Sequence, residues 1–347
     1  MTLISKIDEK HIDKNEIKKQ AEILKKGNTV IFPTETVYGL GANALDEVAV
    51  SKIYEAKGRP SDNPLIVHIY DKGQVNDLAK EINENAKIIM NEFWPGPITI
   101  ILKKKDIVPM RTSGGLDTVA IRMPSNPIAK ALLEEVKLPI AAPSANISGR
   151  PSPTRGKHVY EEMNNRVDGI ILGGDCTFGL ESTVLDLTND IPTILRPGSI
   201  TKEDLEQVIG TVNIDPALER KEDNIKAKAP GMKYKHYSPN ADVFIVSGNS
   251  EKVIDKVNEL VNNNSKEGLR TVVMCLAENQ DKYKSDTIVL GNNLEEVASN
   301  LFNALITADE EKYDIVYTEE FSNDGVGRAI MNRLLKSAGY KIIKIYF

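Results

Sequence analysis

Two cations, Lys57 and Arg59, lie in the polar segment KGRPSDNPLIVH, which runs from Lys57 to His68 and ends in an apolar stretch. Apolar residues at helical spacing from Glu47 to Ala56 precede it and predict a helix that ends at the next glycine, so that both cations lie on a turn. The two prolines restrict the loop before an expected buried strand from Leu65 to Ile69. Two positive groups held at a fixed separation suit an oxyanion such as phosphate or bicarbonate. The alternative is a pair of solvated surface cations.

Polar side chains also occur at the ends of other expected strands. The segment PTETVYGLG, from Pro33 to Gly41, contains hydroxyls and one carboxylate, and it is either a loop that reaches into a pocket or a threonine-rich β-turn. Arg122 ends the expected strand from Thr118 to Met123, where it pairs either with a protein carboxylate or with the carboxylate of a substrate. The segment PSANISGRPSPT, from Pro143 to Thr154, is either a hydrogen-bonding surface for a polar ligand or a flexible surface loop.

Two later segments repeat this arrangement. Ser182 in GLESTV and Arg196 in RPG each stand near a glycine where a strand-like run begins or ends. Small-molecule sites are commonly built from a few polar groups that converge from different elements. The sequence therefore predicts that these strand ends meet around a polar ligand.

The composition limits the classes of function. The chain has 347 residues, and 44 Lys and Arg against 50 Asp and Glu give a formal net charge of -6, which disfavours a protein that mainly grips nucleic acid but allows a local basic cleft. The length predicts two domains. Cys176 and Cys275 lack CxxC spacing, so we expect reduced core residues and neither a disulfide framework nor a zinc site. The charged N-terminal region and the lack of a ~20-residue apolar run predict a soluble, cytoplasmic protein with no membrane partner.

The pattern changes in the last third of the chain. After Ala241, short strand-like runs alternate with helical stretches, which predicts a three-layer α/β domain with a largely parallel sheet. The preceding segment APGMKYKHYSP, from Ala229 to Pro239, has two tyrosines and a histidine and is unlike a plain linker. It either folds over an adenine or triphosphate or docks against a neighbouring domain.

Taken together, these segments closely resemble the threonylcarbamoyl-AMP synthases in their longer form. The resemblance rests on PTETVYGLG, KGRPSDNPLIVH, PSANISGRPSPT, GLESTV, RPG and PGMKYKHYSP, in this order across most of the chain, and more weakly on AIMNRLL near the C-terminus. It implies a YrdC-like twisted mixed sheet with helices at residues 1–210, a linker at 211–240 that folds over the active site, and a small Rossmann-like three-layer α/β domain at 241–347.

The resemblance also implies a reaction. L-threonine, bicarbonate and ATP would give L-threonylcarbamoyl-AMP and pyrophosphate, with Mg²⁺ neutralising the leaving pyrophosphate. Partner proteins would then transfer the threonylcarbamoyl group to tRNA, and tRNA itself is a further possible partner. The carbamate formed from threonine and bicarbonate attacks the α-phosphorus of ATP directly. Positioning and charge stabilisation, rather than a protein nucleophile, would then carry most of the rate.

The motifs carry family roles onto individual residues. The L-threonine set implied by the resemblance is Thr36, His68, Arg122, Ser182 and the backbone near Ala142, in which Arg122 would take the carboxylate and Thr36 and His68 the hydroxyl and amine. The nucleotide and oxyanion set is Lys57, Arg59, Asn63, Thr118, Ser144, Asn146, Ser152 and Arg196. Lys57 and Arg59 would be the catalytic pair, and His236 and Tyr237 would close the linker over ATP.

Three other interpretations remain open at this point. One is an RNA-binding module without chemistry, which the acidic charge and the aromatic content of 5% disfavour. Another is a carbamoyltransferase of the hydrogenase-maturation kind, whose cysteine-rich zinc modules two isolated cysteines cannot supply. The third makes the C-terminal domain an independent nucleotide sensor.

Overall fold

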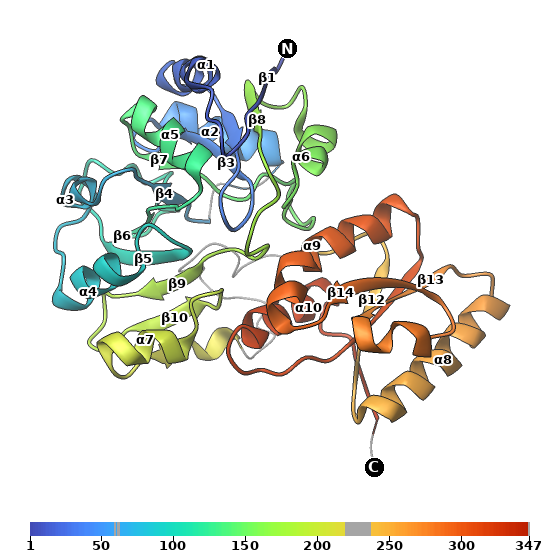
Figure 1. Cartoon of the computed structure of the whole chain (residues 1–347). Coiled ribbons are helices and arrows are strands. Elements are labelled where there is room, and N and C mark those ends of the chain that lie inside the picture. Colours follow the sequence, from blue (N-terminus) through green and yellow to red (C-terminus); the bar gives the residue numbers. More distant parts are fainter. Residues whose placement is uncertain (59, 61–62, 219–236, 346–347) are drawn as a thin grey trace. The chain divides into compact units, whose positions relative to one another are not determined.

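The computed structural model of the chain describes residues 1–58, 60, 63–218 and 237–345 (Figure 1). The chain divides into two compact units, one made of Met1–Ser148 and Ser152–Tyr234, the other of Gly149–Pro151 and Lys235–Phe347. The division falls in the segment that the sequence assigns to a linker, and the exact domain limits stay predictions. No helix among the described residues is both long and apolar enough to cross a bilayer.

The first unit is built on one mixed sheet with the strand order β1-β8-β2-β3-β7-β4-β6-β5-β9-β10-β11. Its strands are β1 Leu3–Lys6, β2 Val30–Phe32, β3 Gly39–Asn43, β4 Ile66–His68, β5 Ile98–Lys103, β6 Thr118–Arg122, β7 Ile140–Ala141, β8 Gly169–Leu172, β9 Thr183–Asp186, β10 Thr193–Arg196 and β11 Asn213–Ile214. Parallel pairs such as β4 with β6 alternate with antiparallel pairs such as β5 with β6. The predicted mixed sheet is confirmed.

The helices of this unit lie on both faces of the sheet. They are α1 Lys14–Lys25, α2 Glu47–Lys57, α3 Val75–Leu78, α4 Glu84–Phe93, α5 Pro127–Val136, α6 Gly156–Met163 and α7 Lys202–Ile209, with short 3₁₀ helices at Lys72–Gln74 and Pro216–Leu218. Side chains of Asp13, Asp46 and Asn126 accept backbone N–H groups in the first turns of α1, α2 and α5. These caps explain where the three helices begin.

Alternation along the central strands sends their side chains to opposite faces. Val119 and Ile121 of β6 belong to the main apolar core, together with residues of α2 and α4. On the other face a small separate cluster, Ile66, Ile101, Ala120, Val184 and Leu195, is contributed by strands alone. Helices α1 and α5 pack on that same face farther along the sheet, over β2 and β7. The candidate site residues described below lie on the face with the small cluster.

Several elements were missed by the sequence analysis, among them β1, β3, α6 and α7. Strand β3 has the sequence GLGAN and lacks the β-branched residues that mark strands. Its Gly41 is required by packing, because an added Cβ would lie 2.8 Å from both Ile140 and the Phe32 ring. Helix α7 did carry a readable signal, the capping box formed by Thr201 and Asp204.

The second unit is a three-layer α/β domain with the strand order β14-β13-β15-β12-β16. Its elements are β12 Asp242–Ser247, α8 Ser250–Lys266, β13 Thr271–Leu276, a 3₁₀ helix Ala277–Lys282, β14 Asp286–Gly291, α9 Leu294–Glu310, β15 Ile315–Glu319, α10 Gly327–Ser337 and β16 Ile342–Lys344. All its strand pairs are parallel. Helix α8 lies on one face of the sheet, and α9 and α10 lie on the other (Figure 1). The predicted parallel three-layer domain is confirmed.

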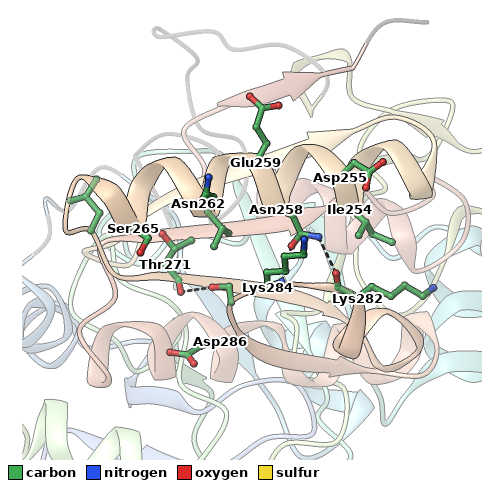
Figure 2. Close-up of a pocket in the computed structure, with 13 residues that line it drawn as sticks. Ile254, Asp255, Asn258, Glu259, Asn262, Ser265, Thr271, Lys282, Lys284 and Asp286 are labelled. Carbon is green, nitrogen blue, oxygen red and sulfur yellow. Dashed lines mark hydrogen bonds between the residues drawn. The ribbon is translucent and has the colours of Figure 1, made fainter.

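A cavity of about 980 Å³ lies along α8 in this unit (Figure 2). Asn258 of α8 fixes the facing loop, because its side chain donates to Lys282 O at 3.0 Å and accepts from Lys284 N at 2.7 Å. The charged residues of the lining are Asp255, Glu259, Asp286, Lys282 and Lys284. This mixture of charges offers no cationic surface for a triphosphate, so the cavity does not support the nucleotide-sensor interpretation.

Both cysteines are buried without a disulfide, as the sequence predicts for reduced core residues. Cys176 and Cys275 are free and buried. Burial raises the pKa of both thiols above the ordinary value, so neither is a thiolate at neutral pH. They act as small core residues.

Candidate functional site

The pairing register places polar side chains from three strands in one row. His68 of β4 is the register partner of Arg122 of β6, and Arg122 is the partner of Thr99 of β5. Partners in a sheet project from the same face. Ser182 stands just before β9, and its Oγ lies 2.8 Å from Thr99 Oγ1. We call His68, Arg122, Thr99 and Ser182 the polar row. The structure thus brings together three of the residues predicted to bind threonine.

Arg122 links the polar row to the loop after β2. Its Nη1 donates to Thr36 Oγ1 at 2.8 Å, and its Nη2 lies 2.6 Å from Glu35 Oε1. The side chains of Arg122 and Glu35 are only 4 and 5% exposed. Of the two alternatives for Arg122, the structure contains the pair with a protein carboxylate. The predicted threonine residue Thr36 therefore joins the polar row directly.

The loop after β2 combines both interpretations of its sequence. Thr34 Oγ1 accepts the N–H groups of Thr36 and Val37 and donates to Val37 O at 2.6 Å, which is a tight hydroxyl-stabilised turn. The same turn holds Thr36 and Glu35 against Arg122. The threonine-rich turn therefore fixes the positions of Glu35 and Thr36 beside Arg122.

His68 is a buried, neutral imidazole. Its Nδ1 lies 3.2 Å from Ile66 O, and because a carbonyl can only accept, Nδ1 donates in this contact. Burial, and to a smaller extent the charge of Arg122, lower the pKa of His68 from 6.5 to about 3. His68 can therefore exchange hydrogen bonds with a ligand but brings no charge near neutral pH.

This low pKa predicts a specific acid sensitivity. Below pH 6.5 the unfolded chain protonates His68 while the folded chain does not, so stability is lost as the pH falls, by about 1.4 kcal/mol per unit. Denaturant titrations at a series of pH values give the free energy of unfolding as a function of pH. Between pH 7 and pH 5 this free energy should fall by about 2 kcal/mol more in the wild type than in His68→Gln. The same fall in unfolding free energy for the wild type and His68→Gln would contradict the lowered pKa of His68.

Arg196 of the nucleotide set shares a partner with the threonine set. Its Nε donates to Ser182 O at 3.0 Å, and its Nη2 donates to Ser182 Oγ at 3.0 Å. Arg196 is 5% exposed. Ser182 Oγ therefore lies between Thr99 and a guanidinium, where its orientation is closely defined.

Lys57 differs from its prediction. It is the last residue of α2 and is 2% exposed, whereas Gly58 does end the helix in the left-handed conformation at φ 61°. Lys57 Nζ donates to Ser144 O at 2.5 Å and to Asn146 O at 2.6 Å. The prediction that Lys57 stands on a turn is wrong, because Lys57 is still part of α2. Its ammonium binds the main chain of the loop after β7. This contact nonetheless joins three residues of the predicted nucleotide set.

The other members of the nucleotide set lie in different surroundings. Asn63 is fully buried, and within the described residues neither atom of its side-chain amide has a hydrogen-bond partner. Thr118 begins β6 on the same face as Arg122 but at the opposite end of the strand. Ser152 Oγ donates to the buried Glu181 at 2.6 Å. Thr118 and Arg122 thus stand at the two ends of β6, with Ala120 of the small apolar cluster between them.

The remaining predicted residues are Ala142, Arg59, His236 and Tyr237. The backbone N–H of Ala142 donates to Ile66 O at 2.9 Å, next to the polar row. Arg59 and His236 lie outside the described residues. Tyr237 belongs to the second unit, where its ring stacks on Phe302 with centroids 5.0 Å apart and lies 5.8 Å from the Arg333 guanidinium carbon.

Sequence reasoning missed two residues of this arrangement, Glu35 and Thr99. Glu35 is the carboxylate noted in PTETVYGLG, and its neighbours Thr34 and Thr36 are the signal that could have singled it out. Thr99 interrupts the apolar run of β5 at a position that points away from the main core. A buried hydroxyl inside an apolar strand needs a partner, which here is Ser182.

Comparison with known proteins agrees with this organisation. A family model described as "Telomere recombination" (Sua5_yciO_yrdC) matches residues 22–198, and one described as "Threonylcarbamoyl-AMP synthase, C-terminal domain" matches residues 200–339. The threonylcarbamoyl-AMP synthase of Pyrococcus abyssi is 49% identical over 346 residues, covering 99% of this chain and 100% of the relative. That of Bacillus subtilis is 48% identical over 341 residues, covering 97% of each chain.

A solved structure of P. abyssi Sua5 complexed with L-threonine superposes with a TM-score of 0.95 at 48% identity, and the match covers 99% of this chain and 100% of that one. The agreement extends over both units, in sequence and in fold. The chain therefore belongs to the threonylcarbamoyl-AMP synthase family.

Proposed function

We propose that this chain joins L-threonine, bicarbonate and ATP into L-threonylcarbamoyl-AMP and releases pyrophosphate. The observation that carries the proposal is the polar row, in which Arg122 and Ser182 lie on the sheet face beside Thr36. Full-length similarity to proteins named threonylcarbamoyl-AMP synthase supports it, as does the likeness to a relative solved with L-threonine.

Threonine recognition follows from the chemistry of the polar row. Arg122 presents a rigid guanidinium that suits a carboxylate, and Thr36 with neutral His68 supplies hydrogen bonds for the hydroxyl and amine. Ser182 and the backbone near Ala142 complete the predicted set. Amino acids without the hydroxyl would leave buried polar groups unpaired, and such a loss discriminates strongly between substrates.

The predicted nucleotide residues extend along the sheet, from Thr118 at the start of β6 to Arg196 beside Ser182. Asn63 offers a buried amide with unused hydrogen-bonding capacity, and Lys57 holds the loop that carries Ser144 and Asn146. Thr118, Ser152 and Arg196 belong to the same predicted set. We infer that the amino-acid and nucleotide regions border each other at Ser182, whose backbone and hydroxyl oxygens both accept from Arg196.

The proposed reaction mainly requires the protein to position the carbamate against the α-phosphorus of ATP. The amine of threonine and bicarbonate form a carbamate, one oxygen of which attacks the α-phosphorus of ATP and displaces pyrophosphate. Lys57 and Arg59 are the proposed catalytic cations. Arg59 would face the developing charge, and the burial of Lys57 suggests that it acts partly by ordering the loop from Ser144 to Asn146. Preorganised groups of this kind lower the barrier without themselves reacting.

Magnesium is proposed to enter with ATP. In the described ranges no three His, Cys, Asp or Glu side chains are grouped so that they could hold a metal ion. Mg²⁺ is commonly bound through substrate phosphates and waters with few protein ligands. When bound, the ion would neutralise charge on the leaving pyrophosphate. We further propose a cytoplasmic location and transfer of the product to tRNA by partner proteins.

Pyrophosphate release tests the proposed reaction. Purified protein given ATP, Mg²⁺, bicarbonate and L-threonine should release pyrophosphate, and omitting either threonine or bicarbonate should reduce release to background, because only the carbamate is the nucleophile. The product is checked by mass spectrometry. Equal release without threonine or bicarbonate would refute the proposal. Salt-sensitive RNA binding without nucleotide turnover would instead support the RNA-binding alternative.

A further inference from the structure

The contact between Glu35 and Arg122 is close but incomplete. Glu35 Oε1 lies 2.6 Å from Arg122 Nη2, yet within the described residues neither atom has a partner in hydrogen-bond geometry. The other carboxylate oxygen accepts a long hydrogen bond from the N–H of Asn126, at 3.4 Å. Both side chains are at least nine-tenths buried. The pair therefore places two opposite charges in the interior with unused hydrogen-bonding capacity on both.

Burying such a pair costs desolvation free energy, and the attraction between the two charges does not fully offset it when hydrogen bonds are missing. Desolvation of two charges is compensated only when the geometry is good and the remaining donors and acceptors are filled. The buried carboxylate of Asp186 has its acceptors filled, because it accepts from Thr188 N, Thr188 Oγ1 and Asn189 Nδ2. Glu35 thus differs from a carboxylate that serves only to hold the fold.

The proposed substrate brings two charges of its own. An amino acid at neutral pH carries a carboxylate and an ammonium on the same carbon, the complement of a guanidinium beside a carboxylate. Arg122 accounts for the carboxylate. Neutral His68 offers no charge to the ammonium, because its pKa is lowered to about 3. Glu35 is the anionic group beside Arg122 in the structure.

We propose that Glu35 binds the α-ammonium of the amino-acid substrate, which docks beside the Glu35–Arg122 pair and fills the hydrogen bonds that this pair leaves open. The inference rests on the proposed function for the identity of the substrate. It makes Glu35 a specificity-determining residue, since an acid with a hydroxyl in place of the ammonium would leave the carboxylate buried opposite a neutral group.

The same carboxylate has a part in carbamate formation. The ammonium must lose a proton before its nitrogen has a lone pair, and Glu35 accepts that proton. The neutral amine then attacks the carbon of bicarbonate. The new N–C bond forms, a C–O bond breaks, and the departing hydroxide takes the second amine proton to become water. Ammonium and bicarbonate thus yield carbamate, one water and one proton held on Glu35, with no oxidant or reductant.

The test compares two ligands on three proteins. The wild type, Glu35→Gln and the control Asp186→Asn are titrated calorimetrically with L-threonine and with 2,3-dihydroxybutanoate, in which a hydroxyl replaces the ammonium. Loss of a charged hydrogen bond should weaken threonine binding to Glu35→Gln by roughly 10- to 100-fold. Binding of the dihydroxy acid should change by less than about 3-fold, since no ammonium is present to lose its partner. The control should match the wild type with both ligands.

A pH series supplies a readout that a purely structural role would not move. Turnover of Glu35→Gln should rise with pH relative to the wild type, because alkaline solution supplies neutral amine without the help of Glu35. Parallel pH profiles would overturn the proton-accepting role. Equal weakening of both ligands, or no weakening of threonine binding, would overturn the ammonium site.

Two further outcomes are distinguishable. If Glu35→Gln does not fold, Glu35→Asp withdraws the carboxylate by one methylene and should still weaken threonine binding more than binding of the dihydroxy acid, and equal effects would refute the proposal. If the wild type binds threonine but releases no pyrophosphate, the proposed reaction fails, while the ligand comparison still decides the role of Glu35.

Discussion

Replacing Arg122 by alanine is expected to lower the free energy of unfolding by about 3–5 kcal/mol, because it leaves the buried Glu35 carboxylate without its cation. Turnover should fall by at least ~10²-fold in the same variant, since a preorganised charge that binds the substrate is lost. Denaturant titration measures the first effect, and pyrophosphate release at saturating substrate measures the second.

Two variants separate these effects. Arg122→Ala combined with Glu35→Gln should regain part of the lost stability, because no unpaired buried charge remains, but it should regain no activity. Arg155→Ala removes an arginine from an exposed pair with Asp175 and should cost less than about 1 kcal/mol. If Arg122→Ala is as stable as Arg155→Ala, or if the double variant gains nothing, the buried pair does not have the energetic role assigned here.

Replacing Lys57 by alanine is expected to lower turnover by ~10²-fold or more. The ammonium holds the carbonyl groups of Ser144 and Asn146, so its removal frees the loop that carries the predicted nucleotide contacts. Arg59→Ala should have an effect of similar size if the two cations act together on the oxyanions, as the sequence predicts. Steady-state pyrophosphate release measures both losses.

The same helix offers a matched control in Lys52. Its Nζ donates to Gly27 O at 2.8 Å and to Asn28 Oδ1 at 2.6 Å, contacts of the same kind as those of Lys57 but in another part of the unit. Lys57→Ala should lose about 1–3 kcal/mol of stability, and Lys52→Ala somewhat less because Lys52 is only partly buried. Turnover of Lys52→Ala should stay within about 3-fold of the wild type, because it holds no predicted site residue. Equal turnover in Lys52→Ala and Lys57→Ala would show that Lys57 is merely structural.

The sequence predicted elements well where periodicity was strong. Helices α1, α5 and α9 and the parallel strands of the second unit follow from apolar spacing that tertiary contacts reinforce. Strand β3 could not be predicted in this way, because its Gly41 is required by the close approach of Phe32 and Ile140, and Ile140 is about a hundred residues away in sequence. Local pattern carries no information about such a contact.

The candidate site shows the same division. Arg122, His68 and Ser182 could be named from their motifs, and sheet register explains why they meet. The ion-pair partner of Arg122 could not be predicted, because a protein carboxylate and a substrate carboxylate both fitted its position at the end of β6. Only the fold brings Glu35 to it. The burial of Lys57 was equally hidden, since the loop that accepts its hydrogen bonds lies about ninety residues away.

The position of Tyr237 bears on how this protein could be shortened. Its ring is held between Phe302 of α9 and Arg333 of α10, within the second unit. A fragment cut to the first unit would therefore lose an aromatic residue predicted to contact ATP, together with the two side chains that hold its ring. If the predicted contact of Tyr237 with ATP holds, changes at Phe302 or Arg333 should alter nucleotide affinity although neither residue belongs to the predicted ATP set.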